Sequence, residues 1–249
     1  MEWRDSFLDL VLIPLSLLLP MAYHVWLWRA VRRRPLRTAA GINAATRRLW
    51  ALSMMKDNEK KAVTVVQSLR NVIMGSTLMA TTAILFCTGI AAVLSSTYTI
   101  KKPLSDAVFG AHGEYMMALK YVALLLIFLF AFLCHSLAIC FLNQASFLMN
   151  TSAAAAAAGG GGAHLGLPDT GDYAVDVLER GFTLNFVGNR LFYAGVPLLL
   201  WIFGPLLAFL SAMVMIPILY NLDIVNVKGD TGCISAKSAD MNGNDCMHV

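Results

Sequence analysis

A histidine inside an apolar stretch is the first residue whose type and position suggest chemistry. His135 lies between Cys134 and Ser136 in a long run of apolar residues. Ionisable side chains are costly to place within a membrane, and those that occur there often line cavities or proton paths. Two interpretations are open. The one we favour is a neutral histidine that hydrogen-bonds to a neighbouring helix, and the other is an intramembrane polar site.

Amides and arginines recur where the apolar stretches begin or end. At one membrane depth, such groups can bind a lipid phosphate or another anion, because a guanidinium donates paired hydrogen bonds to phosphate oxygens. We favour the plainer interpretation, in which these side chains cap helices and extend toward the membrane interface. The candidate cluster comprises Gln67, Arg70, Asn71, Asn143, Gln144, Asn189 and Arg190.

The densest positive charge follows the first apolar stretch. Residues 29–71 hold 11 of the 19 Lys and Arg residues, against only Asp57 and Glu59. Each basic residue near an anionic membrane surface contributes about 1 kcal/mol to binding. We therefore expect membrane lipids as partners, anionic ones on the cytosolic leaflet, and no nucleic acid. The predicted lipid-facing basic cluster comprises Arg29, Arg32, Arg33, Arg34, Arg37, Arg47 and Arg48.

The sequence contains no recognisable motif of an enzyme or of a cofactor site. It has no G-x-S-x-G nucleophile motif, no H-E-x-x-H zinc motif, no P-loop and no dinucleotide-binding fingerprint. Its five cysteines lack the C-x-x-C or Cys/His spacing of a zinc site. We therefore expect no enzyme activity, no metal and no cofactor. One alternative stays open, a membrane enzyme that uses His135.

The elements that must position these residues are apolar stretches long enough to span a bilayer. Hydrophobic residues make up 58% of the chain and charged residues 14%, whereas a soluble domain is about 45–50% apolar and about 25% charged. A spanning helix needs about 20 apolar residues. The sequence predicts an all-α polytopic membrane protein, a four-transmembrane-helix bundle with spans at about residues 8–28, 72–98, 119–142 and 191–220.

The distribution of Lys and Arg predicts the orientation of these spans. Residues 29–71 and 143–190 carry most of the basic residues, and such loops usually face the cytosol. We therefore predict that both the N-terminus and the C-terminus are non-cytosolic, in the plasma membrane or an endomembrane.

Three segments between or after the spans have distinct compositions. Apolar residues recur at three- and four-residue spacing in the first cytosolic loop, which predicts a basic amphipathic helix there. This apolar stripe comprises Ile42, Ala45, Leu49, Leu52 and Met55. That helix either packs on the rest of the protein or lies on the anionic leaflet. Residues 150–168 read as a low-complexity Ala/Gly linker, and 224–249 as a disordered polar tail after a membrane domain at 1–223.

Two of the spans have features that bear on helix packing. Thr88, Ala92 and Ser96 form a series of small residues in the second span, which favours close approach of another helix. The fourth span contains Pro197 and Pro205, and we interpret it as one kinked packing helix.

Two blocks of sequence resemble a known family. The first consists of MMKDNEKK at 54–61, VQSLRN at 66–71 and ATTAIL at 80–85, and the second of RGF at 180–182, GNRLFY at 188–193 and PLLLWIFGP at 197–205. Together they resemble a polytopic membrane family, abundant in land plants, that is catalogued as domain of unknown function five-hundred-ninety-nine. The resemblance covers about residues 1–223 and implies an integral membrane protein. It supplies no established activity and no catalytic residue.

The sequence therefore favours a non-enzymatic membrane component that acts through lipids or other membrane proteins. The alternative is a channel or transporter for a small solute or ion. In that case the chain is expected to form a homo-oligomer, because four helices enclose little volume.

Overall fold

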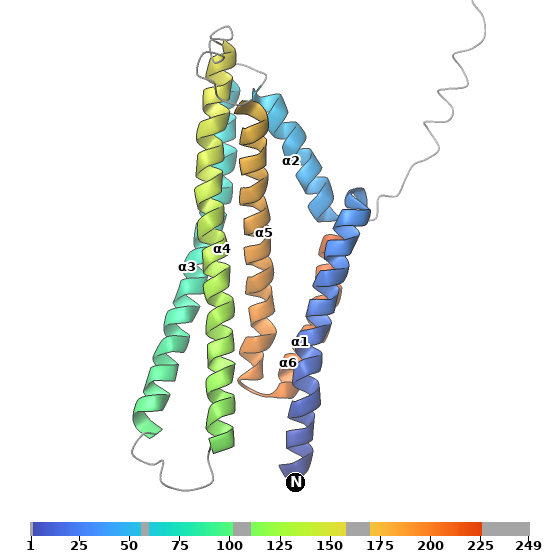
Figure 1. The fold of residues 1–249 in the computed structure, drawn as a ribbon, viewed down its shortest axis with the longest axis vertical. Helices are drawn as coiled ribbons and strands as arrows, with labels where there is room; N and C mark the ends of the chain where they lie inside the picture. The colour runs from blue at the N-terminus through green and yellow to red at the C-terminus, as the bar shows by residue number, and fades with distance from the viewer. Residues whose placement is uncertain (1, 56–59, 102–110, 158–169, 226–249) are drawn as a thin grey trace, which may run out of the picture.

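The computed structural model describes residues 2–55, 60–101, 111–157 and 170–225, and every regular element in them is helical (Figure 1). The elements, in chain order, are α1 (Glu2–Arg33), a 3-10 turn η1 (Pro35–Arg37), α2 (Ala39–Met55), α3 (Lys60–Lys101), α4 (Ala111–Ala157), α5 (Thr170–Trp201) and α6 (Pro205–Asp223). The predicted all-α fold is confirmed.

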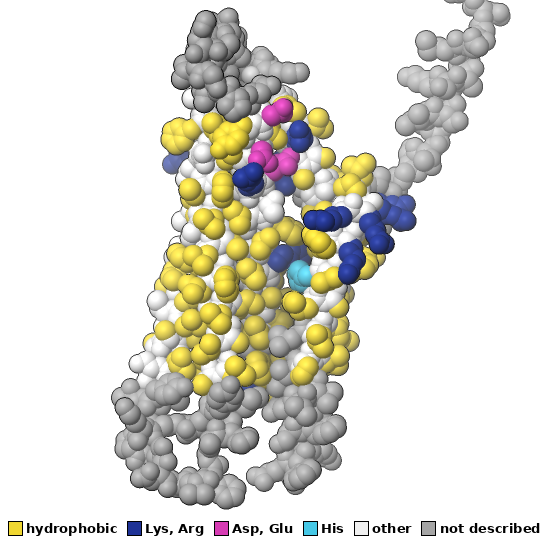
Figure 2. Space-filling model, in the orientation of Figure 1, with side chains coloured by type: hydrophobic (Ala, Val, Ile, Leu, Met, Phe, Trp, Pro, Cys, Tyr) yellow, Lys and Arg dark blue, Asp and Glu magenta, His cyan; other side chains and the backbone are white. Residues whose placement is uncertain are grey.

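Three helices in the described part of the chain are long and apolar enough to cross a membrane, over Val63–Ser96, Met117–Thr151 and Pro205–Asp223. Large apolar side chains lie exposed along them, such as Phe130 on α4. Hydrophobic side chains also cover much of the molecular face in Figure 2. Such a surface is unfavourable in water and suited to lipid. The chain is an integral membrane protein, but a four-span bundle is not confirmed.

The predicted fourth span, 191–220, does not form one helix. Residues 191–201 end α5, and residues 205–220 belong to α6, which runs back beside α1 (Figure 1). Pro205 explains the break, because proline lacks an N–H, disfavours a helical residue before it and fits the first turn of a new helix. At the break, the Lys120 ammonium donates to the Trp201 carbonyl, 3.4 Å away.

The return of α6 also corrects the predicted topology. The Val225 N–H donates to the Arg37 carbonyl at 3.2 Å, and Thr38 pairs with Ile224 in an isolated β-bridge. The end of α6 thus lies beside the predicted first cytosolic loop, residues 29–71, which we call the basic connector. The connector and the chain after α6 were predicted on opposite sides of the membrane, and for Ile224 and Val225 that prediction is wrong. The remaining tail lies outside the described residues.

Helices α4 and α5 pack through glycines spaced seven residues apart. A Cβ added to Gly195 would lie 2.8 Å from Phe128, one added to Gly188 would lie 2.8 Å from His135, and one added to Gly181 would lie 3.0 Å from Leu142. The large partners are themselves seven residues apart on α4. Because residues seven apart share a helix face, each large side chain of α4 fills the space left by a glycine of α5.

A second core joins α2 to the ends of α3, α4 and α5. It includes Ala51 and Met55 of α2, Leu69 of α3 and Leu178 of α5. The predicted connector helix is therefore confirmed as α2, and it packs on the protein. Its buried face differs from the predicted apolar stripe, because Leu49 is 70% exposed.

The predicted linker is helical in its first part. Helix α4 continues to Ala157, so residues 150–157 belong to it, whereas 158–168 lie outside the described residues. Six alanines are too few to nucleate a helix, but extending an existing one avoids the nucleation cost.

Candidate functional site

A hollow of about 1010 Å³ lies where α1, η1, α2 and the end of α6 meet. Lys and Arg side chains gather where α1 meets α2 (Figure 2). Four arginines line the hollow, together with Trp26 from α1, Thr38 from the connector, and Tyr220 and Ile224 from the end of α6. These arginines are Arg29, Arg33, Arg34 and Arg37. No aspartate or glutamate is among the described residues that line this hollow.

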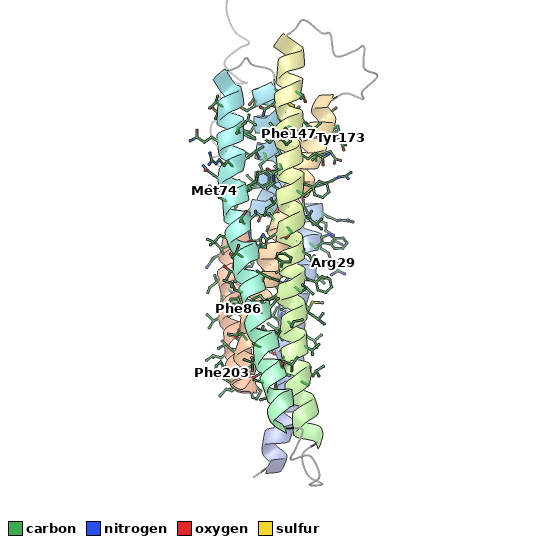
Figure 3. The ribbon with its side chains drawn as sticks, turned by 90° about the vertical axis from the view of Figure 1, so that its left-hand side faces the viewer. Arg29, Met74, Phe86, Phe147, Tyr173 and Phe203 are labelled. Carbon is green, nitrogen blue, oxygen red and sulfur yellow. The ribbon has the colours of Figure 1, made fainter. Side chains whose placement is uncertain are left out.

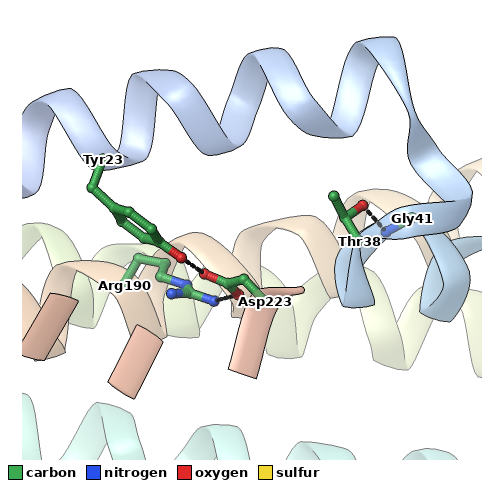
Figure 4. Close-up of polar contacts among 5 residues, drawn as sticks. All are labelled: Tyr23, Thr38, Gly41, Arg190 and Asp223. Atoms are coloured by element: carbon green, nitrogen blue, oxygen red, sulfur yellow. Dashed lines mark hydrogen bonds and ion pairs between the residues drawn. The ribbon is translucent and has the colours of Figure 1, made fainter. Parts of the chain in front are cut away.

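A tight reversal of the chain brings these arginines together. Pro35 ends α1 and opens η1, because it has no N–H to continue the helix. Thr38 then caps α2, since the Gly41 N–H donates to Thr38 Oγ1 at 3.3 Å (Figure 4). Gly41 is required there, because an added Cβ would lie 2.2 Å from the Pro35 carbonyl oxygen. Arginines on both sides of the break therefore face one space.

An aromatic pair borders the hollow. The rings of Trp26 and Tyr220 are stacked, with centroids 5.9 Å apart, and they join α1 to α6. Trp and Tyr are enriched where membrane hydrocarbon meets the headgroups. Apolar side chains of α1 and α6 are exposed on the side of this pair away from the arginines, including Met21 and Ile218. The arginines thus lie next to the aromatic pair, beyond the exposed apolar side chains of α1 and α6.

Two buried polar side chains and a third that is mostly buried hold α1, α5 and α6 together one turn from the aromatic pair. Asp223 accepts a hydrogen bond from the Tyr23 hydroxyl at 2.6 Å and forms an ion pair with Arg190 (Figure 4). The Asp223 side chain is 4% exposed and that of Arg190 is 13% exposed. The Arg190 guanidinium also lies 4.6 Å from the ring centre of Phe186. We refer to Tyr23, Asp223 and Arg190 as the triad.

The predicted lipid-facing basic cluster is divided by the structure. Four members line the hollow, while Arg32 stacks on Trp28 at 4.1 Å and Arg48 is exposed on α2. Arg47 lies over the Phe182 ring at 4.4 Å. Burial lowers the pKa of the Arg47 guanidinium, and nearby Glu179 partly offsets that effect. Arg47 therefore packs on the protein.

The predicted cluster of amides and arginines does not form one site. Gln67, Arg70 and Asn71 line a separate open hollow of about 650 Å³ with Asn150 of α4. Met74 borders the same hollow and projects outward from α3 (Figure 3). The remaining members lie elsewhere: Asn143 and Gln144 are exposed on α4, Asn189 is half-buried on α5, and Arg190 belongs to the triad.

His135 is completely buried between α4 and α5. The ring packs against Gly188 of α5 and lies beside the Asn185 side chain of the same helix, although neither ring nitrogen forms a hydrogen bond of regular geometry. A bond that does join two helices nearby runs from the Ser76 hydroxyl of α3 to Asn185 Oδ1 of α5, at 3.1 Å. The described residues include no cluster of three His, Cys, Asp or Glu side chains able to hold a metal ion.

A family model described as "Protein of unknown function, DUF599" matches residues 11–227. The chain belongs to this family. No curated protein and no solved structure matches the chain. The DUF599 match runs from α1 to just beyond α6 and includes every residue of the basic hollow and of the triad.

Sequence reasoning missed Tyr23, Tyr220 and Asp223 of this DUF599 domain. Asp223 had a signal, since it is the first charged residue after the uncharged stretch that follows Arg190. An aspartate directly after an apolar helix invites a search for a cationic partner. No local pattern identifies Arg190 as that partner, because proline at position 205 is equally compatible with a kink in one continuous helix.

Proposed function

We propose that the protein is a non-enzymatic membrane component that binds anionic lipid headgroups in the basic hollow. The observation that carries this proposal is the lining, in which the described residues include four arginines and no carboxylate, beside a Trp–Tyr pair at the ends of apolar helices. A guanidinium matches the geometry of phosphate oxygens and keeps its charge at all physiological pH values.

The arginines of the hollow have no acidic ion-pair partner among the described residues. Within the described residues, no aspartate or glutamate forms an ion pair with Arg29, Arg33, Arg34 or Arg37; the ion pairs found there are Asp176–Arg180 and Asp223–Arg190. Like charges held close together repel each other, and a bound anion relieves that repulsion. We therefore expect lipid binding to depend on these side chains and to weaken as salt increases.

The proposed site faces the cytosol of a plasma membrane or endomembrane. Support comes from the excess of Lys and Arg in residues 29–71 and from the anionic lipids of the cytosolic leaflet. In this arrangement the N-terminus is non-cytosolic, whereas Ile224 and Val225 lie on the cytosolic side beside Arg37.

Native mass spectrometry of the purified full chain in uncharged detergent tests this function. We expect the protein to retain anionic phospholipid in preference to phosphatidylcholine. The triple variant Arg33→Gln, Arg34→Gln, Arg37→Gln should lose most of that preference. The matched control removes the same charge elsewhere, through Arg48→Gln, Arg70→Gln and Arg180→Gln. Equal losses in both variants would mean that total charge, and not the hollow, attracts lipid.

An oligomeric channel is the second candidate function, and the outer face of α3 favours it. Thr88, Ala92 and Ser96 are exposed, and no atom lies within 4 Å of a Cβ added to Gly89. The predicted small-residue series is thus free to contact another helix. Mass measurement in detergent and ion flux in liposomes test this candidate, and a monomer without flux would exclude it.

A further inference from the structure

We infer that the hollow selects lipid headgroups whose phosphate carries more than one negative charge, as a terminal phosphomonoester does, over phosphodiester and carboxylate headgroups. This inference rests on the proposed function and names the ligand class of the same site. A phosphomonoester carries about 1.5 to 2 negative charges near pH 7, with a second pKa near 6 and three acceptor oxygens.

The charge of the hollow is larger than a singly charged headgroup can neutralise. Arg29, Arg33, Arg34 and Arg37 together carry four positive charges. The nearest acidic residue in sequence to this lining is Asp223, next to lining residue Ile224, and its carboxylate is already bound to Arg190 and Tyr23 (Figure 4). A phosphodiester would leave most of the repulsion in place, whereas a phosphomonoester would relieve more of it.

Hydrogen-bonding capacity supports the same ligand class. Each guanidinium presents five N–H donors in a planar fork. A terminal phosphate exposes three oxygens, and a diester exposes two that are free of ester bonds. Helix α2 also begins at Ala39, directly after lining residue Thr38, and the positive end of a helix dipole favours anions. A phosphate with three oxygens free of ester bonds can therefore accept hydrogen bonds from more of these donors than a phosphate with two.

The position of the hollow favours a lipid over a free phosphate. It opens beside the stacked Trp26 and Tyr220 rings, which are the side chains expected at the boundary of the hydrocarbon region. Exposed apolar side chains continue from that pair along both helices, away from the arginines, with Leu18 on α1 at 63% and Val214 on α6 at 54%. An acyl chain can lie against these side chains while its phosphate reaches the arginines.

The test is a competition among lipids on the purified full chain, read by native mass spectrometry. Phosphatidic acid, phosphatidylglycerol and phosphatidylserine are offered in equal amounts with excess phosphatidylcholine. We expect phosphatidic acid to be retained about fivefold over the other two at pH 8, the ratio for one further charge near a basic surface. The preference should fall at pH 5, where the monoester loses its second charge, and it should disappear in the Arg33→Gln, Arg34→Gln, Arg37→Gln variant.

The other possible outcomes distinguish failure of this inference from failure of the proposed function. Equal retention of all three anionic lipids by the wild-type chain would overturn the selectivity and leave anionic lipid binding intact. No retention over phosphatidylcholine would overturn both. Glycerol 3-phosphate offered at the same concentration provides the soluble arm, and displacement of phosphatidic acid by it would reassign the hollow to a free phosphomonoester. A preference that survives in the triple variant would place the selective site elsewhere.

Discussion

The α3–α4–α5 bundle and the α1–α6 pair are held together by different interactions. In the bundle, Phe128, His135 and Leu142 of α4 fill the spaces above three glycines of α5, and apolar cores lie at both ends. In the pair, the buried apolar core is small and includes Leu27 and Leu219, and the polar triad and the Trp26–Tyr220 stack add to it. Apolar packing therefore holds the bundle together. In the α1–α6 pair, polar contacts position the end of α6.

This difference has a consequence for the candidate site. The basic hollow is built on the α1–α6 side and not on the bundle. Buried ion pairs contribute geometry more reliably than net stability, because desolvation of the charges offsets most of their attraction. The triad therefore fixes the position of one wall of the hollow, at Tyr220 and Ile224, where apolar packing alone is sparse.

The largest effect on stability is expected when the triad loses its carboxylate. Asp223→Ala leaves the Arg190 guanidinium buried without a counter-charge, which costs about 3–5 kcal/mol. Thermal unfolding in uncharged detergent measures this loss. The control is Asp176→Ala, which breaks an exposed ion pair with Arg180 and should cost less than about 0.5 kcal/mol. Equal losses for the two variants would show that the triad is not a buried structural contact.

The next largest effect is expected in the bundle. Gly188→Ala places a methyl group 2.8 Å from the His135 ring, and such overpacking costs about 1–3 kcal/mol. Gly75→Ala on α3 is the matched control. No atom lies within 4 Å of its added methyl group, so the substitution should be neutral or stabilising by about 0.4–1 kcal/mol. His135→Ala in the Gly188→Ala background should restore part of the loss, and failure to do so would contradict the proposed packing.

A smaller effect is expected from the tyrosine of the triad. Tyr23→Phe removes the 2.6 Å hydrogen bond to Asp223 and keeps the ring and the ion pair. The expected loss is about 0.5–1.5 kcal/mol, the usual net contribution of one hydrogen bond, because the Asp223 carboxylate keeps its ion pair with Arg190. Thermal unfolding of the Tyr23→Phe and Tyr220→Phe variants provides the comparison. Within the described residues, no hydrogen bond joins the Tyr220 hydroxyl to a side chain, so Tyr220→Phe should have the smaller effect. If the Tyr220 variant is the less stable one, the role assigned to Tyr23 is wrong.

The sequence predicted local features well and long-range pairings poorly. The second and third predicted spans lie within α3 and α4, and the connector helix is α2, because apolar runs and helical spacing are local signals. The contact between Tyr23 and Asp223, 200 residues apart, has no such signal. It depends on the reversal at Trp201–Pro205, and proline there is compatible with either a kink or a new helix.

The candidate site was predicted in part for the same reason. The arginines from Arg29 to Arg37 were recognised because they are close in sequence, and four of them do share a hollow. Gln67 and Arg190 were grouped because their predicted depths in the membrane are similar. Depth alone does not determine on which side of the bundle a residue lies. Gln67 therefore lines an open hollow beside Asn150, whereas Arg190 is paired with Asp223.

The smallest expected change in stability tests whether the arginines of the hollow form a binding site or a structural contact. The variant Arg33→Gln, Arg34→Gln, Arg37→Gln removes three exposed charges from the hollow without touching the triad or the glycine-lined interface. Without anionic lipid, its stability should equal or slightly exceed that of the wild type, by a few tenths of a kcal/mol, because repulsion among the arginines is reduced.

Thermal unfolding of this variant in uncharged detergent, at about 0.01 M and about 1 M salt, checks the reason as well as the size of the change. Any gain should be present at low salt, where the screening length is about 30 Å, and absent at high salt, where it is about 3 Å. A clear loss of stability at both salt concentrations would show that the arginines hold the connector in place. The hollow would then belong with the structural contacts of the bundle, and the functional distinction between the two regions would be lost.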